Sequence, residues 1–304
     1  MGNSFKFLFF TVCVLSFGLS LLFVRQLPIA KCVHAELEGF EAAASTPVAK
    51  LTKKMNGTAN EHTGRLDCPV TFPNWTSSSR PLVALASFPG SGNTWTRFLL
   101  EVASGFYTGA VYNDKKLYEG GFVGEMEDYK DGRLLVVKTH ATSSESPEFG
   151  PAILLIRNPY DAVISEFTRI KTRRNHTGVL QKDSFKDEDW DRFALTKGNS
   201  WESFNRSWLN RKNRICVVHY EKLVKDVIFE TQRMMTFLNE TLTSTRLRCL
   251  ETHNEGLFHR FRNHSGSASV DVYSKSTRAA MNKHISGVNS VLKQLGEDIV
   301  QQTI

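Results

Sequence analysis

The chain has 304 residues, of which 41% are hydrophobic and 23% are charged, and its formal net charge is +7. This composition is ordinary for a globular protein, and the length is sufficient for one substantial core or two small ones. The chain has no internal repeat and no Cys or His spacing typical of a zinc site, which argues against a repeat protein or a zinc protein.

An apolar segment opens the chain. Residues 7–24 carry no charge and lie between Lys6 and Arg25. As a helix they would be about 27 Å long, close to the roughly 30 Å hydrocarbon thickness of a bilayer. We therefore predict a cytoplasmic tail (residues 1–6) and an uncleaved transmembrane signal anchor. The alternative is a cleavable signal peptide ending at Val33-His34-Ala35, although the apolar run is longer than the ~7–15 residues of a typical signal peptide.

The next segment, residues 25–80, shows little periodicity and is rich in Ala, Ser, Thr, Lys and Glu. This composition is typical of a stem that holds a globular part away from a membrane. We place the globular domain at residues 81–304.

Six glycosylation sequons lie beyond the apolar segment, and they predict that the body of the chain is lumenal. They begin at Asn56, Asn74, Asn175, Asn205, Asn239 and Asn263.

The five cysteines fit that compartment. Cys13 lies in the apolar segment, and Cys216 lies in an apolar strand, where we expect a buried free thiol. Cys32, Cys68 and Cys249 remain as disulfide candidates, and we favour the pair Cys68–Cys249. Cys32, close to the membrane, could link two chains into a homodimer.

From residue 81 onward, short apolar runs alternate with amphipathic segments. The apolar runs, which predict strands buried on both faces, are residues 82–86, 133–138, 152–156 and 215–218. The amphipathic segments predict four helices. The first carries apolar residues from Trp95 to Ala103 and is capped at Gly105, and the second begins at Asn158-Pro159 and continues through Ile170. The third has an apolar face from Val224 to Leu238, and the last carries apolar residues from Met281 to Leu295 and is capped at Gly296. This alternation predicts a three-layer α/β sandwich, similar to P-loop proteins, with a mostly parallel central sheet and helices on both faces. The acidic segment 183–191 is expected to be a solvated loop.

A glycine-bearing turn joins the first predicted strand to the first predicted helix, and we call residues 89–95 the anion turn. It reads Pro89-Gly90-Ser91-Gly92-Asn93-Thr94-Trp95. Backbone N–H groups and the positive end of a helix dipole converge at such a turn, and glycines let an anion approach closely. The Gly-Lys-Ser/Thr ending of the nucleoside triphosphate loop is absent. The turn therefore predicts a phosphate or sulfate site of another kind.

The ends of the other predicted strands also carry polar groups, and parallel strands bind ligands at these ends. They read Lys138-Thr139-His140, Arg157-Asn158-Pro159 with Ser165 eight residues after the Arg, and His219-Tyr220-Glu221. With the anion turn, this arrangement resembles the sulfotransferases, which transfer a sulfonate group from 3′-phosphoadenosine 5′-phosphosulfate (PAPS) to an acceptor hydroxyl. The chain is most similar, from about residue 80 to 295, to the WSC-domain-containing branch, although it has no cysteine-rich WSC module. That branch is associated with sulfation of sialic acid.

The resemblance implies a role for each of these residues. His140 would be the general base, since a His titrates near neutral pH, and Lys138 would stabilise charge on the breaking bond. The implied PAPS-binding residues are Pro89, Gly90, Ser91, Gly92, Asn93, Thr94, Trp95, Arg157, Ser165, Tyr220 and Arg260. For Trp95 and Tyr220, a purely structural packing role is an open alternative.

One position departs from the family pattern. Gly90 stands where sulfotransferases generally have Lys or Arg, and we expect Lys138 or Arg97 to compensate for the missing cation. No metal is expected, because a transferring sulfonate bears less negative charge than a phosphoryl group. A basic stretch from Arg169 to Arg174 is a candidate contact for an anionic acceptor, although charge runs are commonly solvated.

The resemblance therefore implies a single-pass type II Golgi membrane enzyme that sulfates an anionic glycan or glycoconjugate. Nucleic acid is not an expected partner, because a lumenal protein rarely meets it. One alternative is a glycan-binding protein that keeps the fold without catalysis. The other is a P-loop small-molecule kinase, against which the missing Gly-Lys-Ser/Thr and the lumenal setting both count.

Overall fold

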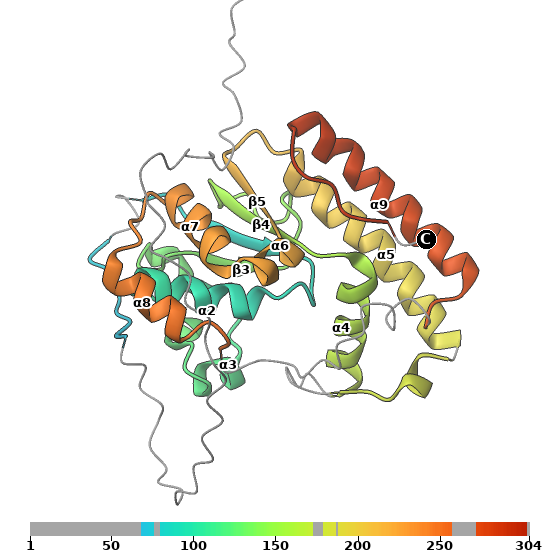
Figure 1. Cartoon of the computed structure of the whole chain (residues 1–304), viewed down its shortest axis with the longest axis horizontal. Coiled ribbons are helices and arrows are strands. Elements are labelled where there is room, and N and C mark those ends of the chain that lie inside the picture. Colours follow the sequence, from blue (N-terminus) through green and yellow to red (C-terminus); the bar gives the residue numbers. More distant parts are fainter. Residues whose placement is uncertain (1–67, 76–79, 173–178, 187, 257–271, 303–304) are drawn as a thin grey trace, which may run out of the picture.

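The computed structural model describes residues 68–75, 80–172, 179–186, 188–256 and 272–302 (Figure 1). The predicted tail, anchor and most of the stem lie outside these ranges. So do three of the sequons (Asn56, Asn175 and Asn263) and Arg260. Within the described ranges, no helix combines the length and the apolar character that crossing a bilayer requires.

A five-stranded parallel sheet forms the centre of the fold. Its strands, in chain order, are β1 (Ala84–Ser87), β2 (Gly109–Ala110), β3 (Val137–Thr139), β4 (Ala152–Ile156) and β5 (Ile215–His219). In space they run β2-β3-β1-β4-β5, with Leu85 of β1 opposite Lys138 on one side and Ile153 on the other. Because every strand is parallel, all five carboxyl ends meet at one edge, as the sequence predicts.

Helices cover both faces of this sheet, which confirms the predicted three-layer arrangement (Figure 1). They are α2 (Asn93–Ser104), α3 (Lys115–Glu119), α4 (Pro159–Lys171), α5 (Glu188–Leu209), α6 (Tyr220–Lys225), α7 (Val227–Phe237), α8 (Ser244–Thr252) and α9 (Lys275–Leu295). Helices α2, α6, α7 and α8 pack with strand residues such as Leu85 and Ile153, and α4, α5 and α9 pack with alternate residues such as Ala84 and Leu154. Each strand is thus buried on both sides, which explains its continuous apolar sequence.

The helix caps predicted at Gly105, Asn158 and Gly296 are confirmed, whereas the apolar face from Val224 to Leu238 belongs to two helices, α6 and α7, that are separated at Asp226. Helix α2 ends at Gly105, which has a φ of 77°, and α9 ends at Gly296, which has a φ of 66°. Helix α4 begins with the Asn158 side chain accepting a hydrogen bond from the Tyr160 N–H at 3.1 Å, and Pro159 occupies the first turn. These caps follow from the freedom of Gly at positive φ and from the fixed φ of Pro.

The prediction of a solvated loop over residues 183–191 is wrong at its end. A 3-10 helix over Lys182–Phe185 is followed by α5, which begins at Glu188. Three tryptophans of α5 are fully buried, and they anchor the helix against the sheet. Glu188, Asp189 and Asp191 belong to its first turn, where negative charge is favourable to the helix dipole.

The disulfide between Cys68 and Cys249 is present, as predicted, and it joins the segment before β1 to helix α8. Cys216 is also disulfide-bonded, which corrects the prediction of a free thiol. The apolar sequence around Cys216 did not distinguish a disulfide from a free thiol, because both forms of cysteine are common in buried strands.

The folded domain extends further toward the N-terminus than the predicted boundary at residue 81. Thr71 donates its N–H to the Gly105 carbonyl at 2.8 Å, and the N–H of Tyr107 donates back to Thr71 at 3.1 Å. Trp75 packs edge-on against Phe106. These contacts are backbone hydrogen bonds and the packing of one aromatic ring. They produce no periodic apolar pattern, so the sequence did not predict that residues 71–75 belong to the domain.

One sequon is buried. The side chain of Asn205 is fully inaccessible, and its Nδ2 donates to the Trp201 carbonyl at 2.8 Å. A glycan on this nitrogen would have no room in the folded domain, so Asn205 is removed from the candidate acceptors. Asn74 and Asn239 are exposed, and their glycosylation remains a prediction.

Candidate functional site

The carboxyl ends of β1, β3 and β4 are neighbours, so the polar groups that follow these strands gather at one place. His140, after β3, has its Nδ1 2.7 Å from the Ser87 carbonyl of β1. Arg157, after β4, donates a guanidinium N–H to the carbonyl of Gly90 in the anion turn at 2.7 Å. These two contacts join the predicted base and the predicted phosphate ligand to the anion turn.

The anion turn requires both of its glycines. Gly90 has a φ of 81° and Gly92 a φ of 96°, a region that disfavours other residues. A Cβ on Gly90 would lie 2.4 Å from the Ala162 carbonyl of α4, and one on Gly92 would lie 2.5 Å from the ring of Tyr220. The turn is thus seated directly on α4 and on Tyr220.

Two side chains of the turn, those of Asn93 and Ser91, are buried but differ in their hydrogen bonding. Asn93 Nδ2 donates to the Leu85 carbonyl and to Ser87 Oγ, both at 3.0 Å, which ties the turn back to β1. Ser91 Oγ is buried and makes no hydrogen bond among the described residues. An unsatisfied buried hydroxyl is costly, so its presence in a turn built from backbone N–H groups fits a site that receives an anion.

An aromatic and cationic cluster adjoins the turn. The Arg157 guanidinium is buried and lies 4.7 Å from the centre of the Tyr220 ring. Tyr220 meets Trp95 edge-on at 6.0 Å, and the Trp95 indole N–H donates to the Asn254 carbonyl at 2.7 Å. Ser165 lies on the other side, its Cβ 3.1 Å from the position a Cβ on Gly90 would take. Three predicted PAPS-binding residues from other elements, Arg157, Ser165 and Tyr220, therefore adjoin the turn.

The hydrogen bond to Ser87 fixes the tautomer of His140. A backbone carbonyl can only accept, so Nδ1 carries the proton and Nε2 carries the lone pair. The imidazole also stacks on the ring of Tyr112, with centroids 5.7 Å apart and planes 25° apart, and the His140 N–H donates to the Tyr112 hydroxyl at 3.0 Å. Tyr112 follows the two-residue strand β2, and no motif in the sequence marked it.

Lys138 lies on β3 with only 6% of its surface exposed. Burial, and after it the nearby charge of Arg97, lowers the pKa of its ammonium group from 10.5 to about 8. The carboxylates of Glu125 and Asp114 act in the opposite direction. At neutral pH the side chain is still protonated, but it is poorly solvated and therefore interacts strongly with a nearby negative charge.

The comparisons with known proteins agree with this geometry. Residues 80–287 match the family described as the sulfotransferase domain. The chain belongs to the sulfotransferase family. A WSCD family member of Drosophila pseudoobscura pseudoobscura is 38% identical over 220 residues, which cover 71% of this chain and 67% of that protein. A WSCD family member of Aedes aegypti is 35% identical over 221 residues, covering 71% and 68%.

A solved structure shares the fold of this sulfotransferase. It is mouse sulfotransferase SULT7A1, described as complexed with PAP, with a TM-score of 0.50 and 16% identity, and the match covers 71% of this chain and 87% of that one. In the present chain, the described residues contain no group of three His, Cys, Asp or Glu side chains that could hold a metal ion.

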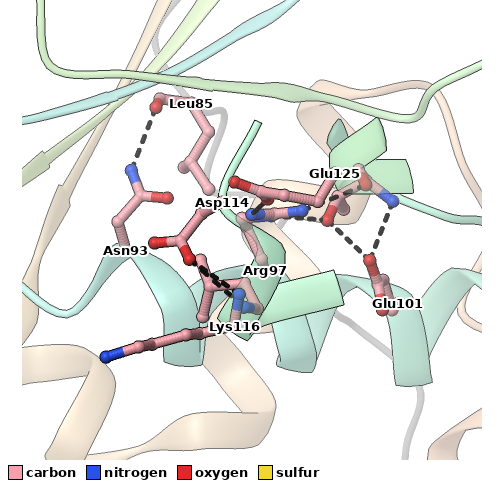
Figure 2. Close-up of polar contacts among 9 residues, drawn as sticks. Leu85, Asn93, Arg97, Glu101, Asp114, Lys116 and Glu125 are labelled. Atoms are coloured by element: carbon pink, nitrogen blue, oxygen red, sulfur yellow. Dashed lines mark hydrogen bonds and ion pairs between the residues drawn. The ribbon is translucent and has the colours of Figure 1, made fainter. Parts of the chain in front are cut away.

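Arg97 does not supply the cation that Gly90 lacks in this sulfotransferase. It is fully buried, donates from Nε to Thr108 Oγ1 at 2.8 Å, and forms an ion pair with Glu125 of the 3-10 helix Val123–Met126. Figure 2 shows Arg97 near Glu125 and Glu101, while the Asn93 amide points to Leu85. The expectation that Arg97 compensates for the missing cation is therefore wrong, because α2 directs the Arg97 side chain toward β2. Lys138 is the remaining candidate of the two.

A second cation lies on α4. Glu166 is buried, and its two oxygens accept from Nε and Nη2 of Arg169, each at 2.7 Å. The positive charge of Arg169 contributes to the lowered pKa of Lys138, so the two cations lie near each other. The backbone N of Glu166 lies 3.1 Å from the Cβ position of Gly90, which places this part of α4 beside the anion turn.

Proposed function

We propose that this sulfotransferase takes a sulfonate group from PAPS and transfers it to a hydroxyl of an anionic glycan, with sialic acid as the first acceptor to test. The observation that carries the proposal is the convergence of the anion turn, Arg157 and His140 at the carboxyl ends of three adjacent strands. Members of the family to which the chain belongs have this chemistry, and the residues present fit it.

The cosubstrate would be held by groups of the anion turn and by residues of α4, α6 and the end of β4 that lie beside it. The N–H groups of the anion turn, the hydroxyl of Ser91 and that of Thr94 would receive the 5′-phosphosulfate. Arg157 and Ser165 would hold the 3′-phosphate, because a guanidinium makes strong charge-assisted hydrogen bonds to phosphate. Trp95 and Tyr220 offer aromatic surface for the adenine. When bound, PAPS supplies an activated sulfonate group.

In the transfer, the acceptor oxygen attacks sulfur and the bond from sulfur to the phosphate oxygen breaks. Nε2 of His140 takes the acceptor proton, because Nδ1 already donates to Ser87. The Lys138 ammonium stabilises the negative charge that develops on the departing phosphate oxygen. The products are the sulfated acceptor and 3′-phosphoadenosine 5′-phosphate (PAP).

Arg169 supports an anionic acceptor. Glu166 occupies the Nε/Nη2 edge of the guanidinium, and no other described residue hydrogen-bonds to the Nη1/Nη2 edge. A guanidinium can bind a carboxylate through that second edge. We expect Arg169→Gln to raise the KM for a carboxylated acceptor by about tenfold or more and to leave the KM for PAPS unchanged. Lys171→Gln is the matched control, since Lys171 lies over the Phe167 ring instead; equal effects of both changes would contradict this role.

The proposed location is the Golgi membrane with the domain in the lumen. The uncharged segment 7–24 and the exposed sequons at Asn74 and Asn239 support it. A tagged full-length chain should co-localise with a Golgi marker and should lose mass on removal of N-glycans. A cytosolic distribution with no glycan would contradict the proposal.

The experiment that tests the function is calorimetric titration of PAP into the purified full-length chain. We expect micromolar affinity, weakened about 100-fold by Arg157→Ala and unchanged by Arg192→Ala, an exposed arginine of α5. His140→Ala should keep PAP affinity and lose turnover. Absence of PAP binding by a folded chain would refute the cosubstrate. Binding without turnover on any acceptor would instead support a non-catalytic glycan-binding protein.

A further inference from the structure

We propose that Tyr112 is a positioning residue for sulfonate transfer, and that its ring fixes the imidazole of His140 in the orientation of a general base. The proposal rests on the proposed function, because it takes His140 as the base. It concerns a residue that neither the sequence motifs nor the family resemblance assigned.

Tyr112 contacts His140 in two ways. Its ring stacks on the imidazole with centroids 5.7 Å apart, and its hydroxyl accepts the backbone N–H of His140 at 3.0 Å. The phenol therefore holds both the side chain and the main chain of one residue. The residue that makes both contacts is 38% exposed and follows a strand of only two residues.

The two contacts of the imidazole restrict different motions. The hydrogen bond from Nδ1 to the Ser87 carbonyl at 2.7 Å fixes one edge of the ring, but it leaves rotation about that bond possible. The stacked face of Tyr112 opposes that rotation. Together, the hydrogen bond and the stacked ring hold the Nε2 lone pair in one direction. A general base needs this, because proton transfer depends on geometry.

The ring of Tyr112 also has an electrostatic effect. When His140 takes a proton it becomes a cation, and a cation is favoured over an aromatic face within about 6 Å. The Lys138 ammonium already lies 5.7 Å from the centre of the same ring. The one ring thus favours positive charge on both residues that the transition state requires to be cationic.

The test compares Tyr112→Leu, Tyr112→Phe and Tyr118→Leu in the full-length chain. Tyr118 is the matched control, because it is a tyrosine of similar exposure, 44%, on helix α3. We expect Tyr112→Leu to lower kcat by about tenfold, with the KM for PAPS and the affinity for PAP within about twofold of the wild type. Tyr112→Phe keeps the ring and should keep kcat within about threefold, and Tyr118→Leu should behave as the wild type.

Three results would overturn the proposal. The first is an unchanged kcat in Tyr112→Leu. The second is a loss of PAP affinity equal to the loss of kcat, which would indicate a general structural role. The third is a Tyr112→Phe variant as impaired as Tyr112→Leu, which would assign the effect to the hydroxyl instead of the ring.

Failure of the proposed function would be recognised separately. A wild-type chain that neither binds PAP nor transfers sulfonate would refute that function whatever Tyr112 does. The stacking itself is then tested by NMR, since an aromatic ring over an imidazole shifts the His140 ring-proton resonances. Tyr112→Leu should remove this shift and Tyr112→Phe should retain it. Identical resonances in all three chains would refute the positioning of His140 by Tyr112.

Discussion

At the scale of single residues, Gly90 shows why this sulfotransferase lacks the cation common in its family. The space that a side chain at residue 90 would enter is filled by the backbone of α4, with the Ala162 carbonyl 2.4 Å from the Cβ position. A lysine there would require α4 to move. Restoring the family residue should therefore lower activity instead of raising it.

The prediction for Gly90 separates crowding from backbone strain. Gly90→Ala should weaken PAP binding by about tenfold or more and destabilise the domain by about 1–3 kcal/mol, since it meets immovable backbone at positive φ. Gly121→Ala is the control: Gly121 has a φ of 102° with no atom near its Cβ position, so only strain of about 1 kcal/mol is expected. Thermal unfolding and PAP titration measure both effects. Equal behaviour of the two variants would show that α4 does not constrain the turn.

The buried charge of Lys138 should lower the free energy of unfolding, although Lys138 supports activity. Its pKa is about 8 in the fold against 10.5 in the unfolded chain, so the unfolded state binds more protons between these values. The destabilisation is then complete below pH 8 and disappears as pH rises to about 10.5. We expect Lys138→Met to be about 1–3 kcal/mol more stable than the wild type at pH 7 and to lose kcat by about 100-fold.

Unfolding measured from pH 7 to pH 10 tests this expectation. The stability of the wild type should approach that of the variant as pH rises. A constant difference across the range would mean that Lys138 does not titrate there.

At the scale of elements, a buried polar network joins α2 to β2 and to the 3-10 helix Val123–Met126. Arg97 and Glu101 of α2 both hold Thr108, which directly precedes β2; Glu101 accepts from its N–H at 2.9 Å and from its hydroxyl at 2.6 Å. Burial raises the pKa of Glu101 from 4.5 to about 7. The negative charge of the Glu101 carboxylate in this network therefore lowers the free energy of unfolding.

Glu101→Gln should remove that cost and keep the acceptor oxygen for Thr108. Because the folded pKa is raised, the destabilisation is absent below pH 4.5 and complete above about pH 7. We expect the variant to be about 1–3 kcal/mol more stable than the wild type at pH 8 and equal to it at pH 4.5. Glu119→Gln, on an exposed face of α3, should change neither value. Denaturant unfolding at the two pH values would contradict the prediction if Glu101→Gln were less stable at pH 8.

At the scale of the whole molecule, the Cys68–Cys249 disulfide closes a loop that contains all five strands of the sheet, and its two cysteines have a sequence separation of 181. Long closed loops restrict the unfolded chain most. The double change Cys68→Ser with Cys249→Ser should lower the free energy of unfolding by about 2–5 kcal/mol. A double variant as stable as the wild type would show that the packing of residues 68–75 is sufficient alone.

Much of this fold follows from local sequence, and the reasons are physical. Strands buried on both faces are continuous apolar runs, and the capping residues at Gly105, Asn158 and Gly296 mark helix ends through their backbone preferences. Helix α5 escaped prediction, because its acidic first turn is typical of a loop as well. The sequence also could not distinguish an exposed sequon from the buried one at Asn205.

The candidate site was partly predictable for the same reason. Residues that directly follow parallel strands meet at one edge, so the gathering of His140 and Arg157 at the anion turn was expected. Tyr112 was not, because its position beside His140 depends on β2 pairing with β3, and sequence spacing does not encode the order of strands. The direction of Arg97 depends in the same way on which helix face meets β2.

The ring of Tyr220 occupies the space that a side chain at residue 92 would need, since it lies 2.5 Å from the position of a Cβ there. A methyl group gained at one position must therefore be matched by bulk lost at the other. Among related chains, the two positions should change together: where residue 92 is not glycine, the counterpart of Tyr220 should be a smaller residue. A library that randomises both codons at once should recover folded pairs that neither single substitution permits.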